Sequence, residues 1–138
     1  MVQEILKNDR IENGRKHILG RRADKTWSVV DCCNAADALI SDVSSIVSDF
    51  LQSEKPYAMM SMRAPVDDFR AEFSVAETGY VILRDLSNLG EMLDDLLGAD
   101  PLAEARAARK RYVLGDFTGE ESAAAFAEYV RGLVGHTP

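Results

Sequence analysis

The stretch "LISDVSSIVSDF" (residues 39–50) places four polar side chains where an apolar run gives way to an amphipathic segment. Asp42, Ser44, Ser45 and Asp49 follow residues that are expected to end a buried strand. At such a junction the first backbone N–H groups of a helix are free and the helix dipole is positive. The pattern therefore favours binding of a phosphate ester. Ser and Asp are also the common N-caps of any helix, so plain helix capping is the alternative interpretation.

Short apolar runs alternate with amphipathic segments along the chain, which indicates strands alternating with helices. Strands are expected at 38–41, 55–62 and 79–85, with a further short candidate at 16–20, and helices at 2–13, 28–37, 44–53, 67–73, 86–98, 100–114 and 122–134. Apolar strands without polar alternation are typical of a parallel sheet covered on both faces. The sequence predicts a single α/β domain over residues 1–138, Rossmann-like, with helices appended at its C-terminus.

Local signals predict several helix ends. Gly14 and Gly98 suit positions just beyond a helix, Ser87 suits an N-cap, and Pro101 suits the first helical position. The last helix is expected to turn one apolar face inward, formed by Ala123, Phe126, Ala127, Val130 and Leu133.

Composition limits the classes of partner. The net charge of −7 argues against a nucleic-acid binder, because no basic excess is available for phosphate contacts. The two cysteines, Cys32 and Cys33, are adjacent and fit reduced thiols of a cytoplasmic protein. No metal-binding spacing, signal peptide or membrane-length apolar run is visible, so we expect a soluble protein without a metal or other cofactor.

The segment "NAADALISDVSSIVSDFLQSEKPYAMM" (residues 34–60) resembles the part of the CDP-glycerol glycerophosphotransferase family that carries the pattern AD-x-LITD-x-SS-x-x-x-D, followed by KP and a strand. That family contains the teichoic-acid polymerases and primases of Gram-positive envelopes. The matching positions are Ala36-Asp37, Leu39-Ile40-Ser41-Asp42, Ser44-Ser45, Asp49 and Lys55-Pro56. The later stretches "LSNLGEMLDDLL" and "YVLGDFTGEESAAAFAEYV" also resemble the C-terminal helices of the family.

The resemblance implies a fold, a ligand and a reaction. The family has a two-domain GT-B architecture whose C-terminal domain binds the CDP-glycerol donor. Carried over to this chain, Ser44 and Ser45 contact the donor phosphates, Asp49 accepts a donor hydroxyl, and Asp42 organises the loop or provides a second acceptor. The implied reaction moves glycerol phosphate, or a related group, from a CDP-activated donor to a hydroxyl of an anionic cell-wall polymer. It implies a cytoplasmic protein at the inner face of the plasma membrane, with a peripheral membrane contact.

This chain departs from the family pattern in its histidines. The family uses a His-Pro motif, which is missing here, and we expect His17 and His136 to be exposed and non-catalytic. The chain looks like the last part of the nucleotide domain and is expected to bind the donor without catalysing transfer. The alternative is a non-catalytic nucleotide-binding or assembly module of the same fold. Loss of the first strands would expose sheet edges, which predicts a homodimer or a rearranged first strand.

The run "EARAARKRY" gathers Arg106, Arg109, Lys110 and Arg111 on one predicted helix. Such a cluster could meet an anionic polymer or lipid headgroups. A solvated helix face, balanced by neighbouring acids, is the competing interpretation.

Overall fold

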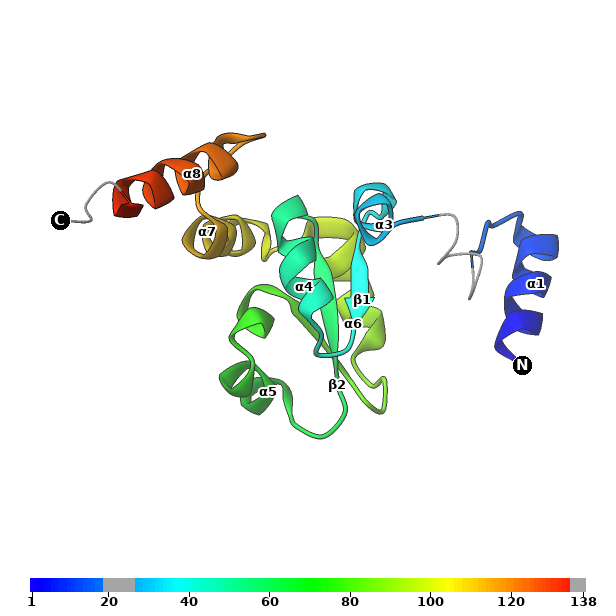
Figure 1. The fold of residues 1–138 in the computed structure, drawn as a ribbon. Helices are drawn as coiled ribbons and strands as arrows, with labels where there is room; N and C mark the ends of the chain where they lie inside the picture. The colour runs from blue at the N-terminus through cyan, green and yellow to red at the C-terminus, as the bar shows by residue number, and fades with distance from the viewer. Residues whose placement is uncertain (19–26, 135–138) are drawn as a thin grey trace. The chain divides into compact units, whose positions relative to one another are not determined.

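The computed structural model describes residues 1–18 and 27–134 of the chain (Figure 1). The chain divides into two compact units, Met1–Ala36 and Asp37–Pro138. The first unit contains α1 (Val2–Asn13) and α3 (Val29–Ala35). Gly14 ends α1 with φ 68, as predicted, because glycine adopts this left-handed conformation without a Cβ clash. Ser28 and Asp31 form a capping box at the start of α3.

The second unit is built on a three-stranded parallel sheet in the order β1 (Leu39–Ser41), β2 (Tyr57–Ser61) and β3 (Tyr80–Leu83). Ile40 lies opposite Ala58, and Met60 lies opposite Ile82. This arrangement confirms the predicted α/β class and the parallel sheet. Of the further strand candidate at 16–20, residues 16–18 are not in a strand, and Leu19 and Gly20 lie outside the described residues.

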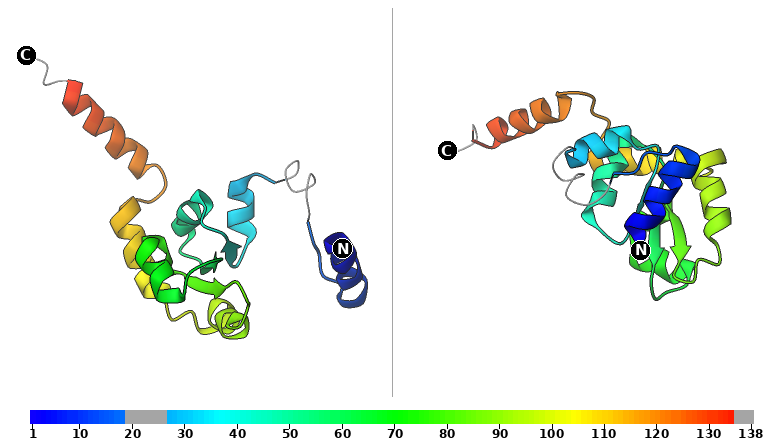
Figure 2. Two further views of the ribbon diagram at one scale, coloured as in Figure 1. Left: turned by 90° about the horizontal axis from the view of Figure 1, so that it is seen from below. Right: turned by 90° about the vertical axis from the view of Figure 1, so that its right-hand side faces the viewer.

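Helical segments connect the three strands and follow the last one. α4 (Ser45–Phe50) with η1 (Leu51–Ser53) joins β1 to β2, and α5 (Val66–Glu72) with η2 (Ser74–Thr78) joins β2 to β3. After β3, α6 (Leu89–Asp94) continues as the π-helical segment η3 (Asp95–Ala99). The right-hand view of Figure 2 shows strands between helices of the second unit.

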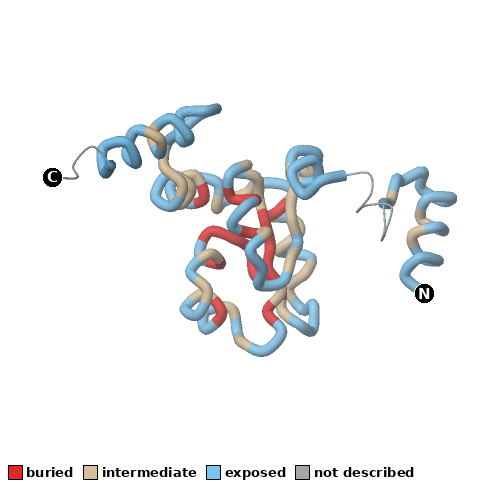
Figure 3. The backbone as a smooth tube through the Cα atoms, in the orientation of Figure 1, coloured by how far each residue is buried: buried red, intermediate tan, exposed pale blue. Residues whose placement is uncertain are grey.

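The core includes the apolar face predicted for residues 44–53. Val47, Phe50 and Leu51 are buried, as the helical spacing in residues 44–53 predicts. Leu96 of η3 packs with Ala58, Tyr80 and Ile82 of the sheet. Figure 3 shows the buried residues concentrated along β2 and β3, with exposed residues over the outer turns of the helices. Both faces of the central strand are therefore covered, as expected for parallel strands.

Three predicted helix ends differ from the structure. Ser87 does not cap α6, because its N–H and hydroxyl both bond to Asp85 Oδ1, at 3.1 and 2.8 Å. Gly98 does not lie beyond the helix, because η3 runs on to Ala99 and Asp100 takes the left-handed conformation (φ 44). Pro101 precedes α7 (Ala103–Leu114) by two positions instead of starting it.

The predicted basic face of α7 is in part an internal anchor. Arg106 is fully buried and forms an ion pair with Asp100. Its Nε donates to the carbonyl oxygen of Glu54 at 2.8 Å, and its Nη1 donates to that of Thr78 at 3.4 Å. The guanidinium carbon lies 5.9 Å from the ring centroid of Tyr57, within cation–π range. Of the two interpretations of the basic cluster, contact with an external anionic polymer or lipid is therefore wrong for Arg106.

Two neighbours of Arg106 also bond within the chain. Arg109 Nη2 donates to Ser74 Oγ at 2.8 Å, and Lys110 Nζ donates to a carboxylate oxygen of Glu54 at 2.6 Å. The Lys110 ammonium lowers the pKa of Glu54. Arg111 is exposed. α7 is thus fastened to η1 and η2 by its basic residues. The pair of Lys110 with Glu54 agrees with a face balanced by neighbouring acids, whereas the buried Arg106 does not fit a solvated face.

The apolar face of α8 (Glu121–Val134) is exposed, contrary to the predicted inward face. Phe126 and Leu133 retain 69% and 60% of their accessible surface. The helix begins where the Glu121 carboxylate accepts hydrogen bonds from the N–H and hydroxyl of Thr118, at 2.7 and 2.8 Å. Among the described residues, no helix combines the length and the apolar character that crossing a membrane requires.

Candidate functional site

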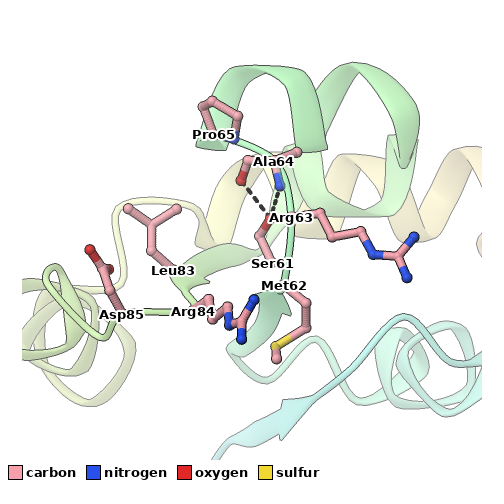
Figure 4. Close-up of a pocket in the computed structure, with 8 residues that line it drawn as sticks. All are labelled: Ser61, Met62, Arg63, Ala64, Pro65, Leu83, Arg84 and Asp85. Carbon is pink, nitrogen blue, oxygen red and sulfur yellow. Dashed lines mark hydrogen bonds between the residues drawn. The ribbon is translucent and has the colours of Figure 1, made fainter.

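The segments that follow the three strands line a cleft at the carboxyl edge of the sheet. Its first cavity, of about 630 Å³, lies at the ends of β2 and β3 (Figure 4) and is lined by Ser61, Met62, Arg63, Ala64, Pro65, Leu83, Arg84 and Asp85. Its second cavity, of about 340 Å³, is lined by Asp42, Val43, Met60, Phe69, Glu72 and Phe73 together with residues 61–64. Because residues 61–64 line both cavities, the two adjoin. Open parallel sheets bind their ligands at this edge.

The loop after β2 is shaped by the side chain of Ser61. The buried Ser61 hydroxyl donates to the carbonyl oxygen of Ala64 at 2.6 Å and accepts from the Ala64 N–H at 3.3 Å. This pair of bonds closes a tight turn and leaves Arg63 exposed within it. The Ser61 hydroxyl therefore stabilises the loop, and the Arg63 side chain of the loop is exposed to solvent.

The loop after β3 is held by Asn88 and Asp85. The Asn88 side chain accepts from the Leu83 N–H at 3.0 Å and donates to the carbonyl oxygen of Val81 at 2.8 Å. Asp85 accepts from the backbone and hydroxyl of Ser87, and these bonds lower the pKa of Asp85. Arg84 lies between Leu83 and Asp85, and the hydrogen bonds of these two neighbours fix its backbone position.

Arg63 and Arg84 are the cationic side chains of the cleft, and Figure 4 shows them extending from neighbouring loops. Both are exposed, and within residues 1–18 and 27–134 no hydrogen bond or ion pair engages either guanidinium group. Arg106 and Arg109, by contrast, are bonded inside the fold. A guanidinium group offers a planar fork of donors that matches phosphate oxygens. The cleft can therefore bind an anion without breaking an existing contact.

The structure brings one of the four predicted site residues into the cleft. Asp42 lines the second cavity, together with the carboxylate residue Glu72. Ser44 is the N-cap of α4, and its hydroxyl accepts from the Ile46 N–H at 3.5 Å, which confirms that Ser44 caps the helix. Ser44, Ser45 and Asp49 are exposed and line neither cavity of the cleft. Their roles in donor binding stay predictions.

His17 is paired with an aspartate of the first unit. His17 belongs to the first unit, where its Nε2 lies 2.5 Å from Asp9 Oδ2. Asp9 also accepts from Asn13 and Arg15, and the bond with His17 contributes most to lowering the pKa of Asp9. His17 is thus half-buried and paired, contrary to the expected exposed side chain. His136 lies outside the described residues.

The described residues show no group of three or more His, Cys, Asp or Glu side chains that could hold a metal ion. The cleft has Asp42, Glu72 and Asp85 as its carboxylates, and Asp85 is already bonded to Ser87. The chemistry available in the cleft is therefore recognition of anionic groups by arginine and of hydroxyl groups by carboxylate.

Sequence reasoning missed Arg63 and Arg84, although a signal for both was present. Arg84 directly follows the apolar run "YVIL", and Arg63 lies two residues beyond the end of β2. An arginine just after a parallel strand is placed at the carboxyl edge of the sheet, where ligands bind. The serines that the sequence favours instead lie at the start of α4, which is only six residues long.

Comparisons with protein-family models, with curated proteins and with solved structures returned no significant match. The candidate binding site is therefore identified by the cleft at the carboxyl edge of the sheet and by the residues that line it.

Proposed function

We propose that this chain is the donor-binding portion of a transferase of cell-wall polymer synthesis. The donor is CDP-glycerol or a similar CDP-activated compound, and the acceptor is a hydroxyl of an anionic polymer. The observation that supports this function is the cleft that combines Arg63 and Arg84 with Asp42 at the carboxyl edge of a parallel sheet. The resemblance of residues 34–60 to the CDP-glycerol glycerophosphotransferase family, and with it the GT-B architecture, supplies the class of donor.

The transfer would proceed by attack of the acceptor hydroxyl on the β-phosphorus of the donor. The new bond forms between the hydroxyl oxygen and that phosphorus, the hydroxyl proton is released to the solvent, the bond from phosphorus to the bridging oxygen breaks, and CMP leaves with its electron pair. Arginine side chains near the diphosphate stabilise the charge that develops on the phosphate oxygens and on the departing CMP. Donor binding is the part of the reaction that this chain performs, and no catalytic base is assigned to it.

A non-catalytic nucleotide-binding or assembly module is the second candidate. It is favoured by the composition of the cleft: the Ser61 hydroxyl is used within its own loop, and none of the described residues that line the two cavities is a histidine. Both candidates share the same ligand and differ in whether transfer occurs.

The proposed partners follow from this function. They are the cytidine nucleotide donor, the anionic polymer acceptor and a second copy of the chain, with no nucleic acid. The proposed location is the cytoplasm at the inner face of the plasma membrane, with a peripheral contact to the lipid surface.

Calorimetric titration with CDP-glycerol, CDP-ribitol and a UDP-sugar tests donor binding. We expect the two CDP compounds to bind more tightly than the UDP-sugar, and Asp42→Asn to weaken the binding of both. If none of the three compounds binds, the donor-binding function is wrong.

The predicted phosphate contacts are tested in the same titration with Ser44→Ala and Ser45→Ala. A loss of affinity with unchanged circular dichroism would support direct contacts, whereas unchanged affinity would contradict them. An assay of CMP release with a poly(glycerol phosphate) acceptor then separates the two candidates. Turnover by this chain alone would contradict a role limited to donor binding.

A further inference from the structure

We propose that the cleft fixes the orientation of its ligand, with a diphosphate in the first cavity and a polyol in the second. Arg63 and Arg84 bind the diphosphate, and Asp42 and Glu72 accept hydrogen bonds from the polyol hydroxyls. The identity of the whole ligand rests on the proposed function, but the diphosphate site is defined by the residues of the first cavity and can be tested without a nucleotide.

The charge of the first cavity supports a diphosphate. Two arginines and one carboxylate, Asp85, line it. One oxygen of that carboxylate accepts two hydrogen bonds from Ser87, which keep Asp85 ionised, so the two arginines leave one net positive charge in the lining. Both arginines are exposed, and neither guanidinium group forms a hydrogen bond or ion pair within the described part of the chain. An anion that enters this cavity gains two guanidinium partners without displacing a protein contact.

The sheet brings the two arginines together. β2 and β3 are adjacent and parallel, and their final residues, Ser61 and Leu83, are paired in register. Neighbouring strands lie about 4.8 Å apart, so the two loops start from adjacent points on the sheet edge. Arg84 is the first residue after β3, and Arg63 is the second after β2. In Figure 4 the Arg63 side chain extends away from Arg84, so both guanidinium groups can meet one diphosphate only after Arg63 rotates about its side-chain bonds.

The second cavity has the opposite character. Asp42 and Glu72 bring two carboxylates to its lining, beside the rings of Phe69 and Phe73. Carboxylates are acceptors, so they bind hydroxyl donors and repel phosphate. Arg63 lines both cavities and marks the junction between phosphate and polyol. The arrangement therefore distinguishes a donor that carries a polyol from a bare nucleoside diphosphate.

The test of the diphosphate site uses inorganic pyrophosphate and calorimetry on the full chain at low ionic strength. Wild-type protein is expected to bind pyrophosphate, and Arg63→Gln and Arg84→Gln should each weaken it about tenfold. The matched control is Arg111→Gln, which removes the same charge from an exposed position on α7 and should leave affinity unchanged. Failure of wild-type protein to bind, or equal weakening by all three variants, would overturn the diphosphate site.

The orientation is tested by comparing CDP-glycerol with CDP. Wild-type protein should prefer CDP-glycerol, and Asp42→Ala and Glu72→Ala, which remove the acceptor oxygens, should abolish the preference while pyrophosphate binding persists. Binding of CDP-glycerol that is insensitive to both arginine variants would overturn this inference and leave donor binding intact. Binding of pyrophosphate without CDP-glycerol would support the diphosphate site and contradict the proposed donor.

Discussion

Replacing Arg106 by methionine should cost this protein a large share of its stability. Methionine is unbranched and has a similar volume, although it is shorter, so the main loss is polar. The ion pair with Asp100 disappears, and the carbonyl groups of Glu54 and Thr78 lose a buried donor. Removing one partner of a buried ion pair costs about 3–5 kcal/mol. A typical domain has a free energy of unfolding of about 5–15 kcal/mol, so this loss would be substantial.

Urea denaturation followed by circular dichroism at neutral pH measures the loss. Arg111→Met is the control, because Arg111 is exposed on the same helix and its replacement should change stability by less than about 0.5 kcal/mol. The double variant Arg106→Met/Asp100→Asn should recover part of the loss, since it removes the unpaired carboxylate. A loss for Arg106→Met below about 1 kcal/mol would refute the anchoring role of this residue.

Three further predictions concern the sheet and its flanking turns. Gly79→Ala should destabilise the fold by about 1–3 kcal/mol in thermal denaturation, because the new Cβ would lie 2.2 Å from the ring of Tyr57, which is held by its hydroxyl bonds to Val75 and Thr78. The free energy of unfolding should fall as pH rises from about 10 to 12, because burial and then the bond to Asp100 raise the pKa of Tyr80 to about 12, above its unfolded value. Denaturation at a series of alkaline pH values measures this fall. Tyr80→Phe should make the fall of stability with pH less steep. Ser44→Ala should cost only about 0.5 kcal/mol in urea denaturation, since its capping bond is long, at 3.5 Å; a cost above about 2 kcal/mol would mean that Ser44 has a further structural role.

The sheet could be predicted from the sequence because its strands are local features. β2 and β3 coincide with continuous apolar runs, and Pro56 stands just before β2, where a missing N–H is tolerated. The apolar spacing of residues 44–53 likewise predicted which side of α4 is buried. Helix ends were less predictable, because Ser87 had a nearby competitor for its hydrogen bonds in Asp85.

The role of Arg106 could not be predicted, because its partners are distant in the sequence. Glu54 and Thr78 lie 52 and 28 residues away, and nothing local separates Arg106 from Arg109. The cleft has the same difficulty, since its lining comes from the ends of three strands. For α8, the periodicity located an apolar face, but periodicity does not reveal whether that face has a partner.

The side-chain amide of Asn88 forms hydrogen bonds with the backbone of β3 that a neighbouring strand would otherwise form. By bonding Val81 and Leu83 at once, it occupies an acceptor and a donor that β3 would otherwise offer to an approaching polypeptide. Open rows of such groups let sheets polymerise between molecules. This side chain therefore leaves fewer free groups for strand pairing on β3, which lies at the opposite end of the described sheet from β1.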